Sequence, residues 1–275
     1  MDFLLSKMGG MKRNSVKSLL KHRQVSVNGE VITLFDYQLQ QGDKVLLNTT
    51  RGNTELQHKL LKIIYEDRDF IVVDKKEGLL TVTTGNHRDV TAFSILKNYV
   101  KKASPKNKIY TVHRLDRETS GVLLFSKNRD LQHDLRNNWH SLVKKRTYLA
   151  LVEGRVEKEQ DYIMSWLKEE EVSLKVKSSN RDNGGKQAVT HYKRVQSNDK
   201  FSLLEIELET GRRNQIRSQL EFIGHSIAGD KKYGSTISFG RVALHAHTLE
   251  FLHPVTGKKM TFASPVPKEF TRVFK

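Results

Sequence analysis

The chain of 275 residues contains no cysteine. Disulfide bonds and thiolate metal sites are therefore excluded, and this composition fits a reducing cytoplasm. No stretch approaches the run of about 18 apolar residues that a transmembrane helix needs, so we expect no membrane span. The N-terminus, MDFLLSKMGGMKRNS, holds only the short apolar patch FLL, which makes it a poor secretory signal.

Several common functional motifs are also missing. Neither of the phosphate-binding patterns GxxxxGK[ST] and GxGxxG occurs. Ser120 lies near His113 and Asp116 in the sequence, but it lacks the G-x-S-x-G context of a hydrolase nucleophile. No helix-turn-helix or zinc-finger pattern indicates a DNA-binding protein. We predict no metal site, because no carboxylate cluster accompanies the late histidines His245, His247 and His253.

Positive charge is what the sequence has in excess. It has 48 lysines and arginines against 31 acidic residues, a net charge of +17. A basic surface attracts polyanions, and binding to nucleic acid releases the counterions condensed on the phosphates. No basic amphipathic helix is long enough to suggest a membrane surface instead. The composition therefore favours a nucleic-acid partner.

Residues 1–48 are predicted to form a small unit of helix, hairpin and strand. The helix is capped by Asn14 or Ser15, and apolar residues recur along it at helical spacing. Asn28-Gly29 is a strong hairpin signal after a short alternating strand. The helix is otherwise basic, and the cations that we expect to contact RNA are Arg13, Lys17, Lys21 and Arg23.

The remainder of the chain divides into a linker and a larger domain. Residues 49–60 are polar and lack periodicity, which predicts a linker, and 61–275 form the larger domain. Its strands and helices do not alternate regularly, which favours an α+β fold with a mixed, mainly antiparallel sheet. Helices are predicted at 91–100, 130–139 and 213–223, and strands at 63–65, 70–73, 122–125, 146–153, 188–195, 201–209, 242–252 and 259–263. The basic segment 175–194 is predicted to be an exposed loop that leads into the strand at 188–195.

The densest cluster of polar residues is HRLDRETSG at 113–121, directly before a buried strand. That position places the cluster at the mouth of a core. Arg114 and Arg117 flank Asp116, and nearby positive charge favours the ionised form of a carboxyl group. An ionised carboxylate can act as a nucleophile or a base. From these residues alone, a salt-bridged surface loop is an equally good interpretation.

The longer string HRLDRETSGVLLFSK at 113–127 resembles the signature loop of the RluA family of RNA pseudouridine synthases. Four further segments resemble motifs of that family in the expected order, and the whole resemblance covers about 61–265. Those segments are 64–80, 145–154, 210–234 and 241–253. Residues 3–47 also resemble the S-four-type RNA-binding module, which is named for a small-subunit ribosomal protein.

The resemblance implies a pseudouridine synthase fold and an isomerase that uses neither cofactor nor metal. In this reaction the C1′–N1 bond of a uridine breaks, the uracil turns, and C5 bonds to C1′. Asp116 is the implied catalytic residue, which either attacks the ribose or assists proton loss from it. Tyr148 is implied to pack on the uracil and to help remove the C5 proton. Arg217 is implied to pair with Asp116 and to keep it ionised, and Arg114 to lie in the loop that enters the RNA where the target base is flipped out.

The sequence departs from the family pattern at two places. Lys76 stands where a proline is common, and Arg213-Asn214 stand where Thr-His is common. Neither position is assigned to bond making, so we expect both to affect how RNA is held.

The RNA partner is predicted with less detail than the chemistry. An S-four-type module fits large structured RNA, which favours large-subunit ribosomal RNA, with transfer RNA as the alternative. A non-catalytic RNA-binding or ribosome-assembly protein is the main rival, and the joint presence of Asp116, Tyr148 and Arg217 argues against it. We expect a cytoplasmic monomer.

Overall fold

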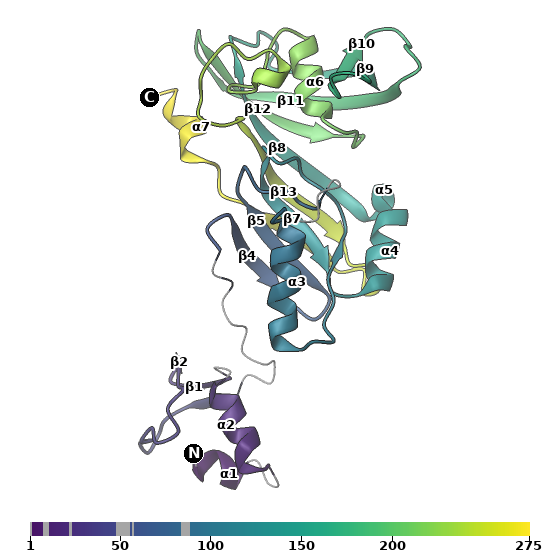
Figure 1. Cartoon of the computed structure of the whole chain (residues 1–275). Coiled ribbons are helices and arrows are strands. Elements are labelled where there is room, and N and C mark those ends of the chain that lie inside the picture. Colours follow the sequence, from purple (N-terminus) through teal and green to yellow (C-terminus); the bar gives the residue numbers. More distant parts are fainter. Residues whose placement is uncertain (1, 8–10, 22–23, 48–55, 57, 84–88) are drawn as a thin grey trace. The chain divides into compact units, whose positions relative to one another are not determined.

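The computed structural model describes residues 2–7, 11–21, 24–47, 56, 58–83 and 89–275 (Figure 1). Arg23 and most of the predicted linker 49–60 lie outside these residues. The chain forms two compact units, Met1–Gln57 with Asn98–Asn107, and His58–Lys97 with Lys108–Lys275.

The first unit contains two helices, α1 (Asp2–Lys7) and α2 (Arg13–Lys21), and a small antiparallel sheet. The sheet order is β2-β1-β3, with β1 at Val25–Val27, β2 at Glu30–Val31 and β3 at Val45–Leu47. The predicted helix and hairpin are therefore present. Helix α1 was not predicted, because its short apolar patch contributes only one buried side chain, that of Leu4. The core of this unit is Leu4, Val16, Leu20 and Val25.

Backbone conformation sets the hairpin between β1 and β2. Asn28 and Gly29 have φ values of 52° and 91°, the left-handed geometry that tight hairpin turns require. The Asn28 side chain donates to Asp43 Oδ1 at 2.8 Å and accepts from the Lys44 amide at 2.9 Å. One side chain therefore joins the hairpin to the segment that enters β3.

The second unit is built on one large sheet, of eleven strands in the described part of the chain. The strand order is β10-β9-β11-β12-β8-β13-β7-β5-β4, with β14 paired to β13 and β6 paired to β7. Every one of these pairs is antiparallel except β13 with β7. The predicted α+β class and the mixed, mainly antiparallel sheet are thus confirmed. The strands are β4 (Leu61–Glu66), β5 (Phe70–Lys75), β6 (Tyr110–Thr111), β7 (Ser120–Ser126), β8 (Val143–Glu153), β9 (Gln160–Glu169), β10 (Val176–Ser179), β11 (Lys186–Ser197), β12 (Phe201–Leu208), β13 (Leu244–Leu252) and β14 (Lys259–Ala263).

Helices and one 3-10 turn make up the remaining regular structure of the described residues. Figure 1 shows α6 beside the β9–β12 end of the sheet. Three of the helices were predicted to within a few residues, whereas α5 and α7 were not. The elements are α3 (Ala92–Ala103), α4 (Arg129–Asn137), α5 (Trp139–Leu142), α6 (Gln215–Phe222), the 3-10 turn η1 (Lys231–Tyr233) and α7 (Lys268–Arg272).

The prediction was wrong for two neighbouring strands. Strand β10 lies inside 175–194, which was predicted to be a loop, because only Val176 of its four residues is buried. Strand β9 was not predicted at all. Its inward residues alternate regularly, but apolar Tyr162 and Met164 on the outward face are exposed. Apolar residues on both faces hide the alternation by which a half-buried strand is recognised.

Two buried glutamines fix α6 on the sheet. Gln219 is fully buried, and its amide donates to Ile163 O, Ser165 Oγ and Ala188 O. Gln215 donates to Val189 O at 3.0 Å. A buried amide is stable only when its donors and acceptor are satisfied, and such satisfied networks are directional. The helix is therefore held in one orientation on β9 and β11.

The parallel pair of strands fixes the start of β7 at the centre of the sheet. Ser120 is opposite His245, and Gly121 is opposite Ala246. Gly121 has a φ of 112°, and a Cβ atom there would lie 2.0 Å from Ala246 O. Only glycine allows this approach. The loop 113–119, which precedes β7, is consequently held against the centre of the sheet.

Candidate active site

Asp116, Tyr148 and Arg217 come together in one cleft of about 650 Å³. They come from different parts of the fold: the loop before β7, strand β8 and helix α6. Apolar residues that share the cleft include Leu208, Ile216 and Leu244. The cleft thus combines a carboxylate, an aromatic ring, a guanidinium and apolar walls.

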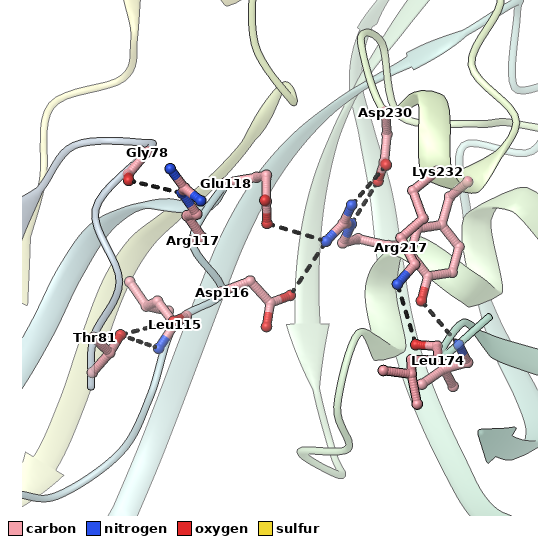
Figure 2. Close-up of polar contacts among 12 residues, drawn as sticks. Gly78, Thr81, Leu115, Asp116, Arg117, Glu118, Leu174, Arg217, Asp230 and Lys232 are labelled. Carbon is pink, nitrogen blue, oxygen red and sulfur yellow. Dashed lines mark hydrogen bonds and ion pairs between the residues drawn. The ribbon is translucent and has the colours of Figure 1, made fainter. Parts of the chain in front are cut away.

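Hydrogen bonds hold the residues directly before and after Asp116, as Figure 2 shows. The buried Thr81 hydroxyl donates to Leu115 O at 2.7 Å and accepts from the Leu115 amide at 3.1 Å. After Asp116, the Gly78 amide donates to Arg117 O at 2.8 Å, and Arg117 Nε donates to Gly78 O at 3.1 Å. The carboxylate is therefore carried by a backbone that has little freedom to move.

A buried lysine is also hydrogen-bonded to this loop. Lys75 is completely buried, and its ammonium group donates to the carbonyl oxygens of Lys76, Leu79 and Arg117 at 2.9 to 3.3 Å. Burial lowers the pKa of Lys75 to about 8, and the charges of Asp116 and Glu118 act in the opposite direction. Lys75 therefore connects the segment after β5, at Lys76 and Leu79, to the loop that carries Asp116, at Arg117.

Arg217 is fixed more firmly than the sequence suggested. Its main partner is Asp230, to which Nε and Nη2 donate at 2.6 and 2.7 Å, and both side chains are buried. The Tyr233 ring lies under its guanidinium, 4.8 Å from Cζ. Its remaining nitrogen, Nη1, lies 3.5 Å from Glu118 and 3.9 Å from Asp116. Figure 2 marks both contacts with dashed lines. The implied contact with Asp116 is present, but it is the longest of three carboxylate contacts.

The charge environment of Asp116 differs from the expectation. Burial raises its pKa, Arg217 lowers it in part, and Glu118 raises it further. Arg117 is turned to Gly78, and Arg114 is exposed. The positive charge that favours ionised Asp116 therefore comes first from Arg217, a hundred residues away in the chain, rather than from its sequence neighbours.

Tyr148 lies in the middle of β8, opposite Ile206 of β12 and Ala246 of β13. Burial raises the pKa of its hydroxyl, and the charge of Asp116 raises it further. The hydroxyl is therefore protonated at neutral pH. The ring lines the cleft beside Asp116, where a flat aromatic surface suits a planar base taken out of a stack.

Another wall of the cleft contains residues that the sequence did not single out. Arg146 lies over the Trp139 ring, with Cζ 5.4 Å from the ring centroid, and both residues line the cleft. His113 also lines it and accepts a hydrogen bond from the Leu124 amide at Nε2. Burial first, and then Arg146, lowers the pKa of His113 to about 3. His113 is therefore neutral, with its proton on Nδ1.

The alternative sites considered from the sequence do not assemble. Ser120 Oγ lies 2.8 Å from His245 Nδ1 and accepts from Arg241 at 2.6 Å, so it is not paired with His113. His247 Nδ1 lies 2.8 Å from Ser264 O. In the described ranges, no group of three or more His, Asp or Glu residues is arranged to hold a metal ion.

The cations predicted on the first helix of the small unit are partly described. Arg13, Lys17 and Lys21 are exposed on α2, where they leave Val16 and Leu20 to the core. Arg23 lies outside the described residues. Among the helices that are described, none has the length and apolarity to cross a bilayer.

Comparisons with known proteins agree on one kind of activity. A sequence model described as RNA pseudouridylate synthase matches residues 69–222. An uncharacterized RNA pseudouridine synthase of Bacillus subtilis, YlyB, is 33% identical over 98% of this chain and 91% of its own length. Ribosomal large subunit pseudouridine synthase D of Nitrosomonas europaea is 31% identical over 94% of this chain and 78% of its own. The structure of human RNA pseudouridylate synthase domain containing 4 covers 76% of this chain, and 90% of that structure is matched, with a TM-score of 0.63 and 21% identity, which shows the shared fold.

Proposed function

The chain belongs to the RNA pseudouridylate synthase family, and we propose that it acts on specific uridines of large-subunit ribosomal RNA with Asp116 as its catalytic residue. The family assignment makes the chain an enzyme that isomerises uridine to pseudouridine in RNA. The observation that carries the catalytic proposal is the meeting of Asp116, Tyr148 and Arg217 in one cleft. The ribosomal proposal is supported by the relative from Nitrosomonas europaea, which is named a ribosomal large subunit pseudouridine synthase.

Each of the three residues has a role that its surroundings support. Asp116, partly exposed and close to Arg217, acts on the ribose once it is ionised. Tyr148 packs on the uracil ring, and once C5 has bonded to C1′ its hydroxyl accepts the C5 proton while it passes its own proton to the Asp116 carboxylate in the same cleft. Arg217 stabilises negative charge on Asp116 from a fixed position, which costs no reorganisation during the reaction.

The basic face of α2 supports a role for the first unit in holding RNA. Replacing Arg13, Lys17 and Lys21 with alanine removes three phosphate contacts in this proposal. The slope of log affinity against log salt should then decrease by roughly two to three units, because each contact contributes somewhat under one unit. Lys258→Ala, an exposed lysine on the β13–β14 turn, is the matched control and should leave the slope unchanged. An unchanged slope in the triple variant would reject RNA binding by α2.

Mapping of pseudouridine tests the substrate. Total RNA from cells with and without the gene is compared, and the purified enzyme is then incubated with ribosomal and transfer RNA transcripts. We expect the enzyme to be a monomer and to act in the cytoplasm. We expect one or more large-subunit positions to lose pseudouridine with the gene and to regain it in vitro. If pseudouridine were lost from transfer RNA alone, transfer RNA would be the substrate instead of ribosomal RNA.

Substitution of the carboxylate tests the catalytic assignment. Asp116→Asn should retain less than about one percent of the rate while binding RNA within a few-fold of wild type, because phosphate contacts supply most affinity. Asp199→Asn, an exposed aspartate outside the cleft, should retain full activity. Substantial turnover by Asp116→Asn would favour another catalytic residue.

A further inference from the structure

A second cavity of about 360 Å³ adjoins the cleft. The two cavities share Asp116 and Arg217, together with Arg114, Arg213 and Asn214. The second cavity then continues beyond the catalytic loop to the turn η1. Asp116 therefore borders two spaces, of which the first contains Tyr148 and the second contains the lysines of η1.

Cations outnumber carboxylates around the second cavity, by six to three. Besides Arg217, it is bordered by Arg114, Arg117, Arg213, Lys231 and Lys232. Its carboxylates are Asp116, Glu118 and Asp230, and Asp230 is already bound by Arg217 through two short contacts. Positive charge is thus in excess in this space, which favours an anionic group of the substrate.

Most of these cations already have a partner in the protein, but two do not. Arg213 is paired with Glu169, Arg117 donates to Gly78 O, and Lys232 donates to Leu174 O. Within the described ranges, the side chains of Arg114 and Lys231 have no ion pair and no hydrogen bond. Both are exposed, and they come from opposite sides of the cavity, the catalytic loop and η1.

We propose that the second cavity binds a phosphodiester group next to the target nucleotide, with Lys231 as a phosphate ligand. This proposal rests on the proposed function, which places the target C1′ at Asp116 and the uracil beside Tyr148. The two phosphates of a nucleotide are attached to the same ribose as its base. With the ribose at Asp116, where the two cavities meet, the base extends into the cleft. One of the two phosphates then extends into the second cavity, toward Lys231 and Arg114.

Binding of small nucleotides tests the proposal without turnover. Uridine, uridine 3′-monophosphate, uridine 5′-monophosphate and inorganic phosphate are each titrated into the full-length protein and followed by NMR. The proteins are wild type, Lys231→Ala and the control Lys258→Ala. In wild type and the control, one monophosphate should bind about fivefold or more tightly than uridine, as expected for a charge-assisted contact. Lys231→Ala should reduce that gain to less than about twofold and leave uridine binding unchanged.

Three results would overturn the proposal. These are equal binding of uridine and both monophosphates to wild type, a gain that persists in Lys231→Ala, and binding of inorganic phosphate as tight as that of the nucleotide. The last result would describe a general anion site. Failure of the proposed function gives a different result: the RNA remains unmodified although Lys231→Ala still abolishes the phosphate-dependent gain.

Discussion

The two sides of the cleft position their charged groups in different ways. On the loop side, Asp116 is carried by a backbone to which Thr81, Lys75 and Gly78 are bonded. On the helix side, Arg217 is held by its own side chain, through two bonds to Asp230 and contact with the Tyr233 ring. The carboxylate is thus fixed at its backbone, and the guanidinium is fixed at its functional group.

This difference suits the two residues to different tasks. In the proposed reaction the Asp116 carboxylate approaches the ribose, which agrees with its partial exposure and its long 3.9 Å contact with Arg217. A guanidinium that stabilises charge must already be in place, because preorganised groups cost no reorganisation at the moment of reaction. The contrast predicts that damage on the helix side will exceed damage to single bonds on the loop side.

Removing Arg217 should have the largest effect. Arg217→Ala should reduce the single-turnover rate about a hundredfold or more. It should also lower the free energy of unfolding by about 3–5 kcal/mol, because Asp230 is left buried without a partner. The acid limb of the pH–rate profile should move to higher pH, since Arg217 lowers the pKa of Asp116. Urea denaturation and single-turnover assays measure these effects.

A double variant separates catalysis from stability on the helix side. In Arg217→Ala with Asp230→Ala no buried charge is left unpaired, so much of the stability should return while activity should not. A double variant that is stable and active would show that Arg217 only neutralises Asp230. In that case the helix side would contribute nothing to the reaction beyond folding.

Gly121→Ala should have the next largest effect, and it acts on the loop side through the backbone. The new Cβ would meet Ala246 O at 2.0 Å in a left-handed conformation. We expect a loss of about 2–5 kcal/mol in the free energy of unfolding, from backbone strain and overpacking together. Gly184→Ala is the matched control, since it also has positive φ, at 72°, but no atom near the added Cβ. Equal losses would mean that strain alone, and not the approach to β13, requires glycine at 121.

Thr81→Val removes one pair of bonds from the loop side. Leu115 then keeps a buried amide and carbonyl without a partner, which should cost about 1–3 kcal/mol in chemical denaturation. The rate should fall only a few-fold, because Lys75 and Gly78 still hold the loop after Asp116. Thr81→Ser keeps the hydroxyl and should restore most of both losses. A serine variant as impaired as the valine variant would show that packing of the methyl group, which only serine lacks, matters as much as the hydroxyl.

The loop side was more accessible to sequence reasoning than the helix side. The string around Asp116 is contiguous, and its polar residues directly precede a buried strand, so both the loop and β7 were predicted. Asp230 was not singled out, because nothing local distinguishes a buried carboxylate from a turn residue. Lys75 was missed for the same reason, since its burial and its bond to Arg117 O exist only after β5 and the loop 113–119 have come together.

The strands show the same limit. β8 and β12 were predicted because apolar residues run along them, and the centre of each strand is buried. β9 has exposed apolar residues on its outer face, and β10 buries only Val176, so their pairing was not evident. The position of α6 depends on these strands, through Gln219. The sequence therefore predicted that Arg217 is on a helix and that it contacts Asp116, but not that Asp230 is its main partner.

The smallest expected effect concerns Glu118, which lies between the two sides. Its charge raises the pKa of Asp116, and it lies closer to Arg217 than Asp116 does, at 3.5 Å. Glu118→Gln removes a negative charge that disfavours ionised Asp116 and leaves Arg217 freer to interact with it. Both changes lower the pKa of Asp116, so the acid limb of kcat/KM, which reports the free enzyme, should move to lower pH.

The rate of Glu118→Gln should therefore stay near wild type at neutral pH and exceed it about threefold on the acid limb, as expected for one partly exposed charge. Glu207→Gln, an exposed glutamate on β12 outside the cleft, is the matched control and should leave the profile unchanged. The profile is best measured by single turnover with RNA folded in advance, so that pH acts on the enzyme alone. A shift of the acid limb to higher pH would mean that Glu118 holds Arg217 in place for Asp116, and the two sides of the cleft would then depend on each other.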